Sequence, residues 1–355
     1  MPIYSPTLAE ALTLVHEDTY VRREGGDLVA QSSSQQIIAD LIDRLDLEAG
    51  MRVLEIGTGS GYSTALLAHL AEDTGWVVSI DVVADLVERA GRLLAADGYS
   101  NTTILRADGA QGAPEHGPFD RIIVWTTAPH LPTTWTTQVA PDGVIVSPIA
   151  LAPVSKSGVG TRTRLKGGAT PYVDQLFPAG FVEMHGQELD QWLLPPYGVD
   201  VVSRDDSGRP CWLSGPWLRS PEHYVQGQRL LQSLITNRES TAGPLGSEES
   251  ATDFRAWLLA TRPGGLTTAA LGEPLWQLGY AHSGGAALTD VRSATQTVTN
   301  GDTEAAAVLA GWADTWRQLG SPGLADLRTQ LIPFYDGWTL EATLDRHASN
   351  QGSST

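Results

Sequence analysis

Cysteine is almost absent from this sequence. The chain has 355 residues and a single cysteine, Cys211. One cysteine excludes an internal disulfide and a cysteine-based metal cluster, so we expect a protein of the reducing cytoplasm. We also expect no bound metal ion, because the eight histidines show no spacing typical of metal ligands.

Positive charge and long apolar runs are scarce as well. The chain has 23 Lys and Arg against 41 Asp and Glu, a formal net charge of −18. Proteins that bind nucleic acids through phosphates normally carry the opposite sign, so we expect no nucleic-acid partner. No stretch approaches the ~18 apolar residues of a membrane helix. The first residues lack the basic and apolar regions of a secretory signal, and we expect no membrane partner. The sequence leaves the oligomeric state open.

Strand and helix patterns alternate in the first half of the chain. A helix is predicted over 34–47 from apolar residues at helical spacing. The predicted elements that follow are strands at 53–56, 77–81, 103–105, 122–124 and 144–146, and helices at 62–70 and 84–96. Such repeated βα units predict an α/β, Rossmann-like fold with a mostly parallel sheet. Strand-like pieces at 161–165 and 181–184 are expected to complete the sheet in antiparallel fashion.

The sequence predicts four segments. Residues 1–33 form a short irregular segment, 34–187 a ligand-binding domain, 188–347 a smaller mixed or mainly α domain, and 348–355 a disordered tail. The smaller domain is expected to contain a loop at 240–252 and a helix at 304–319. Its tryptophans favour a role in the core over a peptide-binding groove; they are Trp192, Trp212, Trp217, Trp257, Trp276, Trp312, Trp316 and Trp338.

A glycine-rich turn follows the first predicted strand. The segment Gly57-Thr58-Gly59-Ser60-Gly61 connects this strand to a helix. Glycines let the backbone approach a ligand closely, and the free N–H groups of the helix start lie near it. The spacing differs from the G-x-G-x-x-G pattern of dinucleotide enzymes, which favours S-adenosylmethionine over a nicotinamide cofactor. Glu55, just before the turn, is expected either to contact the cofactor or to brace the loop.

Acidic residues end the next two strands. Asp81 ends the second strand, followed by Val82, and its carboxylate could accept both hydroxyls of a ribose. Asp108 and Gly109 follow the third strand, where they could bracket an adenine ring. With the glycine turn, these strand ends predict a pocket for an adenosine with a short charged tail.

Several segments together resemble the protein-L-isoaspartate O-methyltransferase family. The matching stretches are Ser32-Ser33-Ser34-Gln35-Gln36, Arg52–Tyr62, Ala107-Asp108-Gly109, Phe119–Val124, Thr126-Thr127-Ala128-Pro129 and Pro141-Asp142-Gly143. The resemblance implies transfer of a methyl group from S-adenosylmethionine to a carboxylate of a peptide or protein. A carboxylate is already ionised at neutral pH, so catalysis needs orientation and water exclusion rather than a strong base.

The resemblance also implies substrate contacts. In the family pattern a serine or threonine before the glycine motif contacts the reacting carboxylate. Counting back from the glycines places Ser33 there, whereas matching Ser-Gln selects Ser34; either serine could instead only cap a helix. Thr126, Thr127 and His130 lie in the loop after the fourth strand and are expected to bind substrate, although His130 could be a plain surface residue.

The chain departs from the family at both ends. Fewer residues precede the active serine than usual, and well over 100 follow the methyltransferase part. These departures resemble aspartyl O-methyltransferases that tailor ribosomal peptides such as lanthipeptides and graspetides, where the Asp methyl ester collapses to a succinimide and can become isoaspartate. We therefore expect Asp methylation of a modified precursor peptide, linear or cyclised, and we expect residues 188–347 to act as an accessory domain that recognises it. The alternatives are general isoaspartate repair, a catalytically decayed peptide-binding scaffold, and, least favoured, a dehydrogenase.

Overall fold

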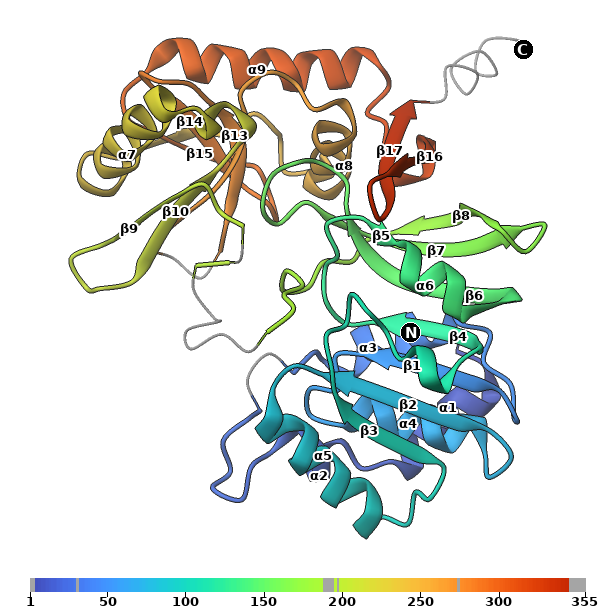
Figure 1. Ribbon diagram of the computed structural model, residues 1–355. Coiled ribbons are helices and arrows are strands. Elements are labelled where there is room, and N and C mark those ends of the chain that lie inside the picture. The colour runs from blue at the N-terminus through green and yellow to red at the C-terminus, as the bar shows by residue number, and fades with distance from the viewer. Residues whose placement is uncertain (1–3, 30–31, 188–194, 197, 273–274, 345–355) are drawn as a thin grey trace. The chain divides into compact units, whose positions relative to one another are not determined.

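The chain divides into two compact units in the computed structural model, which describes residues 4–29, 32–187, 195–196, 198–272 and 275–344 (Figure 1). Unit 1 comprises Met1–Ile149, Val159–Asp190 and Leu331–Thr339, and unit 2 comprises Ala150–Gly158, Gln191–Gln330 and Leu340–Thr355. The sequence predicts a boundary at 187–188, and the long segments of the two units meet at 190–191. Two short segments, Ala150–Gly158 and Leu331–Thr339, belong to a different unit from the residues on either side of them. The tail predicted at 348–355 and Trp192 lie outside the described residues.

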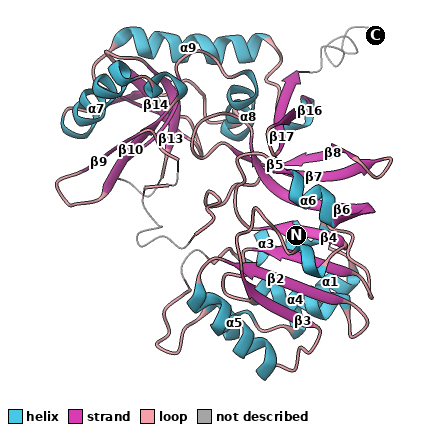
Figure 2. Ribbon diagram, in the orientation of Figure 1, coloured by secondary structure: helices cyan, strands magenta, loops and turns pink. Residues whose placement is uncertain are grey.

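Unit 1 is built around a mostly parallel sheet (Figure 2). Its elements are α1 (Pro6–Leu14), α2 (Glu17–Val21), α3 (Gln35–Asp43), β1 (Arg52–Ile56), α4 (Tyr62–Ala71), β2 (Trp76–Asp81), α5 (Ala84–Ala96), β3 (Thr102–Arg106), η1 (Pro114–His116), β4 (Phe119–Val124), β5 (Leu131–Pro132), α6 (Thr133–Gln138), β6 (Val139–Ala150), β7 (Gly158–Lys166) and β8 (Thr170–Phe177). The strand order is β3-β2-β1-β4-β6-β7-β8, parallel from β3 to β6, with β7 and β8 antiparallel. The predicted Rossmann-like fold is confirmed.

Burial explains the central strands and the helix that follows them. Val53, Leu54 and Ile56 of β1 are at most 2% exposed, as expected for a parallel strand covered on both faces. Helix α4 is buried along nearly its whole length and shares a core cluster with α1 and α3. The chain runs from β1 outward to β2 and β3 and returns to β4 on the other side of β1. The switch point where α/β proteins bind ligands therefore lies between β1 and β4.

The described residues before 33 contain two helices, α1 and α2, which corrects the expectation of an irregular segment. Helix α1 begins after Ser5, whose hydroxyl accepts a hydrogen bond from the Leu8 N–H, with Pro6 in the first turn. Leu8 and Ala11 are buried in the core cluster that also contains α4. These short helices gain their stability from packing rather than from length, so their local pattern was too brief to identify.

At the edge of the sheet, β7 confirms the strand predicted at 161–165, but the last strand differs from expectation. Residues 181–184 form no strand; a single bridge joins Thr127 to Glu183. The sheet instead ends with β8, which begins with Thr170-Pro171. Proline lacks an N–H group, so it is tolerated near the start of an edge strand such as this one.

Unit 2 contains a second sheet of seven strands, so it is mixed rather than mainly α. Its elements are β9 (Val201–Arg204), β10 (Pro210–Ser214), η2 (Pro216–Arg219), α7 (Pro221–Thr236), β11 (Glu239–Ala242), α8 (Ala251–Thr261), β12 (Leu266–Leu271), β13 (Gln277–Ala281), β14 (Ala286–Asp290), β15 (Gln296–Thr299), α9 (Thr303–Gln318), η3 (Leu324–Asp326), β16 (Leu327–Phe334) and β17 (Gly337–Leu344), the last two reaching into unit 1. The sheet order is β11-β15-β14-β13-β12-β10-β9, and every pair is antiparallel.

The sequence placed two features of unit 2 close to their observed positions. Helix α9 matches the predicted 304–319 helix, and the predicted loop at 240–252 is shortened by β11 and by the start of α8. Trp212, Trp257 and Trp316 are at most 5% exposed and belong to the core. Among the described residues, the longest helices are too short and too polar to cross a membrane.

Asp302 offers a test of the fold of unit 2. Its carboxylate accepts hydrogen bonds from the Glu304 and Ala305 N–H groups at 2.8 and 3.1 Å, and the Ala305 bond is the main cause that lowers the pKa of Asp302. Asp302→Ala should lower the free energy of unfolding by ~1 kcal/mol at neutral pH. Folding lowers the pKa of Asp302 below its value of ~3.9 in the unfolded chain. The stabilisation by the ionised carboxylate is therefore complete at pH values above ~3.9, and it is lost as the pH falls through the pKa of the folded state.

Urea unfolding of wild type and Asp302→Ala at neutral and acid pH measures this difference. The control is Asp206→Ala, which removes an exposed carboxylate at a turn. It should leave the free energy of unfolding unchanged at both pH values. An equal loss at both pH values would contradict the capping role.

Candidate active site

The glycine turn after β1 has the backbone conformation that its sequence predicts. Gly57, Gly59 and Gly61 have φ angles of +97°, +52° and +88°, in the left-handed region that favours glycine. The Gly57 and Thr58 N–H groups both donate to the Ile80 carbonyl, at 2.8 and 3.2 Å. This pair of bonds closes the turn onto the end of β2, and the Gly61 N–H donates to the Thr58 carbonyl at 2.9 Å within the turn.

Asp81 lies beside this turn. Its Oδ2 accepts a hydrogen bond from the Gly59 N–H and its Oδ1 one from the Val83 N–H, both at 3.0 Å. The side chain is partly exposed, as is neighbouring Val82, and each carboxylate oxygen retains a second lone pair. The carboxylate is therefore oriented by the backbone and still able to accept two ribose hydroxyls.

Asp108 and Gly109 end β3 at the same edge. Asp108 Oδ1 accepts from the Ala110 N–H at 3.0 Å, and a Cβ on Gly186 would lie 2.9 Å from Asp108 Oδ2. Gly109 is buried, and a Cβ there would lie 2.5 Å from Ile56 Cγ2. Because β3, β2 and β1 are parallel neighbours, the predicted cofactor residues are brought together. No local pattern indicated that Gly186 approaches Asp108.

Glu55 is completely buried, and its carboxylate braces the loop rather than facing a ligand. It accepts four hydrogen bonds, from the Ser63 hydroxyl at 2.5 Å, the Ser79 hydroxyl at 2.6 Å, the Trp125 indole at 2.9 Å and the Thr64 hydroxyl. Burial raises the pKa of Glu55, and the four hydrogen bonds act in the opposite direction. Of the two roles open from sequence, the geometry favours bracing.

The side chains of Thr58 and Ser60 also shape the turn. The Thr58 hydroxyl lies 2.7 Å from that of Ser79, and Thr58 is 1% exposed. Ser60 Oγ accepts from the Tyr62 N–H at 3.3 Å. The Thr58 hydroxyl is thus engaged within the protein and that of Ser60 accepts a backbone hydrogen bond, and a cofactor contact by these two residues stays a prediction.

Ser33 and Ser34 differ in their surroundings. Ser34 is exposed and caps α3, where its hydroxyl lies 3.5 Å from the Ile37 N–H. Ser33 is half-buried, and within the described part of the chain its hydroxyl has no hydrogen-bond partner. Gln35, the residue after Ser34, donates a hydrogen bond to the Tyr62 hydroxyl at 2.7 Å. This bond joins the start of α3 to the start of α4. The start of α3, which the serines precede, is therefore tied to the helix that follows the glycine turn.

The loop after β4 contains the three residues predicted to bind substrate. The Thr127 hydroxyl is bound to the backbone of Phe181, donating to its carbonyl at 3.1 Å and accepting from its N–H at 3.0 Å. His130 Nε2 lies 2.9 Å from Asp336 Oδ1. These contacts occupy the Thr127 hydroxyl and one ring nitrogen of His130, and a substrate role for either residue stays a prediction. Thr126 Oγ1 is buried without a partner among the described residues, so it remains able to bind a ligand.

Two residues near the turn were missed from sequence. Arg89, on α5, donates to the Ser60 carbonyl at 3.1 Å and to the Arg22 carbonyl at 2.5 Å, and burial lowers its pKa. Tyr20, on α2, packs against Tyr62 with ring centroids 6.4 Å apart. Together they tie α2 to the glycine turn. An arginine among the apolar positions of α5 was the available signal for this contact.

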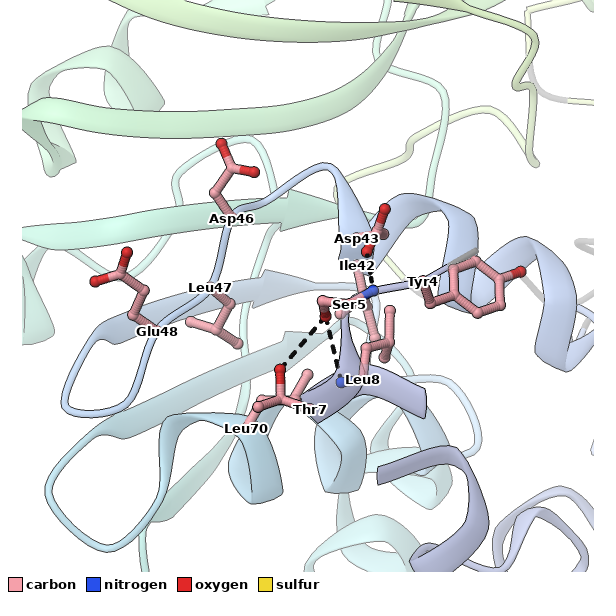
Figure 3. A pocket seen from close by; sticks show the side chains of 10 residues that line it. All are labelled: Tyr4, Ser5, Thr7, Leu8, Ile42, Asp43, Asp46, Leu47, Glu48 and Leu70. Atoms are coloured by element: carbon pink, nitrogen blue, oxygen red, sulfur yellow. Dashed lines mark hydrogen bonds between the residues drawn. The ribbon is translucent and has the colours of Figure 1, made fainter. Parts of the chain in front are cut away.

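A cavity of about 450 Å³ lies away from this site (Figure 3). Its lining comes from the start of α1, the end of α3 and residues 46–48 before β1, so it is at the amino end of that strand. Three carboxylates line it, from Asp43, Asp46 and Glu48. No group of three or more possible metal ligands is found within the described ranges.

Gly61 provides a test of the turn. A Cβ there would lie 3.0 Å from Ala90 Cβ, in a residue with φ of +88°. Gly61→Ala should lower the free energy of unfolding by ~1–2 kcal/mol, the cost of a left-handed alanine. The control is Gly91→Ala on α5, where a Cβ meets nothing within 4 Å. It should instead raise stability by ~0.5–1 kcal/mol, because alanine favours a helix. Chemical denaturation measures both, and a neutral Gly61→Ala would contradict the geometry.

Comparisons with known proteins agree with this geometry. The family described as protein-L-isoaspartate(D-aspartate) O-methyltransferase matches residues 13–176. Relatives named protein-L-isoaspartate O-methyltransferase include one from Methanococcoides burtonii, 36% identical over 42% of this chain and 76% of the relative. Another, from Myxococcus xanthus, is 34% identical over 45% of this chain and 74% of the relative.

A solved structure titled protein-L-isoaspartate O-methyltransferase has a similar fold over both units. It covers 96% of this chain and 95% of its own, with a TM-score of 0.50 and 19% identity. The chain thus has the fold, the glycine turn and the sequence of a recognised family. It belongs to the protein-L-isoaspartate O-methyltransferases, which are S-adenosylmethionine-dependent protein carboxyl methyltransferases.

Proposed function

We propose that this protein transfers a methyl group from S-adenosylmethionine to the free carboxylate of L-isoaspartyl residues in proteins or peptides. The observation that carries the proposal is the family match over residues 13–176, which includes every strand end of the site described above. Isoaspartate methylation was the alternative to peptide tailoring in the sequence interpretation. The names of the relatives support it more than they support the tailoring of a modified ribosomal peptide.

The residues beyond the family match do not favour a peptide-tailoring enzyme. The long C-terminal part suggested a dedicated peptide substrate because family members usually end earlier. However, the solved structure with the isoaspartate title is covered over 95% of its chain by both units together. A second unit is therefore compatible with the isoaspartate reading, and chain length does not separate the two.

The residues present fit the cofactor and its chemistry. The backbone of the glycine turn and the Asp81 carboxylate would hold S-adenosylmethionine, and a Cβ at Gly109 would not fit against β1. S-adenosylmethionine supplies an electrophilic methyl group, which bonds to a carboxylate oxygen as the bond from sulfur to carbon breaks. The acceptor is ionised at neutral pH, so the protein has only to hold and orient it.

Ser33 is the residue that we assign to holding the carboxylate. Its hydroxyl has no other partner in the described part of the chain, whereas that of Ser34 caps α3. Thr126 Oγ1 is a second available donor. After transfer, the following backbone amide nitrogen attacks the methyl ester, methanol leaves and a succinimide forms. This step is intramolecular and needs no side chain of the enzyme.

Methyl transfer to matched peptides tests the function. Wild-type protein is incubated with S-adenosylmethionine and one of three acceptors: an isoaspartyl peptide, the same peptide with aspartate, and a modified precursor peptide. Mass spectrometry follows the gain of a methyl group and the later loss of methanol. Only the isoaspartyl peptide should react. Reaction of the precursor alone would establish peptide tailoring, and no reaction with cofactor bound would favour a decayed binding protein.

Asp81→Asn tests the cofactor assignment. The substitution removes a charged acceptor, and hydrogen bonds to charged groups contribute about 1.5–3 kcal/mol, so Kd for S-adenosylmethionine should rise ~10–100-fold. Asp73→Asn, an exposed residue at the turn after α4, should leave Kd unchanged. Calorimetric titration measures both, and an unchanged Kd for Asp81→Asn would remove this residue from the site.

Ser33→Ala and Ser34→Ala should have different effects. Ser33→Ala should lower kcat/KM for the isoaspartyl peptide ~10–100-fold through the lost hydrogen bond to a charged group, with Kd for S-adenosylmethionine unchanged. Ser34→Ala should mainly lower stability, by ~1 kcal/mol for the lost helix cap. Steady-state kinetics and urea unfolding separate these results. A catalytic defect confined to Ser34→Ala would reverse the assignment.

A further inference from the structure

The turn between β16 and β17 presents two aromatic side chains to solvent. Phe334 is 54% exposed and Tyr335 is fully exposed. Their rings are in edge contact, with centroids 6.3 Å apart. The turn lies in Leu331–Thr339, which belongs to unit 1 although it follows unit 2 in the chain. A single exposed aromatic side chain is ordinary, but two together on a tight turn are typical of a contact surface.

Backbone and side-chain contacts hold this turn in place. The Thr133 N–H donates to the Asp336 carbonyl at 2.8 Å, and Asp336 Oδ1 lies 2.9 Å from His130 Nε2. The His130 ring packs on Phe334, with centroids 5.7 Å apart. β17 pairs with β5, beside which Figure 1 shows the red hairpin. The orientation of the aromatic pair is therefore set by residues 130–133.

The same loop begins at the proposed active site. Trp125 follows β4, and a Cβ on Gly57 of the glycine turn would lie 3.2 Å from Trp125 Cβ. Thr126, with its unpartnered hydroxyl, comes next. Five residues separate Trp125 from His130, and an extended chain of that length spans at most ~18 Å. The aromatic turn is thus within reach of a peptide whose reacting carboxylate lies at the glycine turn.

We propose that Phe334 and Tyr335 bind the polypeptide chain next to the isoaspartyl residue. This inference rests on the proposed function, because it takes the substrate to be a peptide or protein. Aromatic rings offer large, rigid contact areas to backbone and apolar side chains at low entropic cost, and the phenol adds a polar group. The surface continues the active-site loop, so its occupant is the chain that carries the reacting group. Affinity should then depend on peptide length, because a short peptide does not reach the turn.

Kinetics with two peptides test this contact. Both contain isoaspartate, one with only its immediate neighbours and one extended by about ten residues on either side, enough to span the distance to the turn. The variant Phe334→Ala/Tyr335→Ala should raise KM for the long peptide about tenfold, the loss expected for aromatic contacts at an interface. KM for the short peptide and KM for S-adenosylmethionine should not change. The matched control is Tyr172→Ala, which removes a 43% exposed aromatic residue from β8 and should leave all values unchanged.

A binding measurement separates this inference from the proposed function. Fluorescence anisotropy gives Kd of the labelled long peptide for each protein saturated with S-adenosylhomocysteine, without turnover. Weaker binding to the double variant supports the contact even if wild type methylates neither peptide, an outcome that would overturn the proposed function alone. If the Kd and KM values for the long peptide are equal in wild type and the double variant, Phe334 and Tyr335 do not contact the peptide. Methylation by wild type in that case still supports the proposed function. If wild type neither binds nor methylates the long peptide, both proposals are wrong.

Discussion

Burying a carboxylate without hydrogen-bond partners would cost several kcal/mol of folding free energy. A buried carboxylate therefore requires hydrogen-bond donors on several sides of it. Glu55 receives them from the first turn of α4, from β2 and from the loop after β4. These donors, Ser63, Ser79 and Trp125, lie 16 or more residues apart in the chain, and each must be in place for the carboxylate to be satisfied. The hydrogen bonds to this one side chain thus hold the surroundings of the glycine turn together.

The position of Glu55 decides what the turn itself can offer a ligand. With the hydroxyls of Thr58 and Ser60 bound inside the protein, the turn presents backbone rather than side chains. Its glycines adopt left-handed conformations that other residues reach only at a cost of ~1–2 kcal/mol. Asp81 is oriented in turn by the Gly59 N–H. The cofactor edge is therefore rigid, and the more variable chemistry is left to the serines of α3 and the loop after β4.

The loop after β4 links this edge to the chain's C-terminal part. Residues 331–339 belong to unit 1 although they lie between two segments of unit 2, and the start of β17 pairs with β5. His130, which was predicted to bind substrate, contacts Asp336 in this packing. Its ring also packs on Phe334, so the contact fixes the aromatic pair beside the loop.

The sequence alone was enough to identify the parallel sheet, the glycine turn, Asp81 and Asp108. These features depend on local patterns: alternation of strands and helices, glycines that permit positive φ, and acids at strand ends. The helices before residue 22 and strand β8 escaped detection because short elements depend on packing more than on local preference. Only the tertiary structure decided the partners of Glu55, Thr127 and His130. Their hydrogen bonds join residues far apart in the chain, and no local pattern encodes which distant group will arrive to satisfy a buried polar atom.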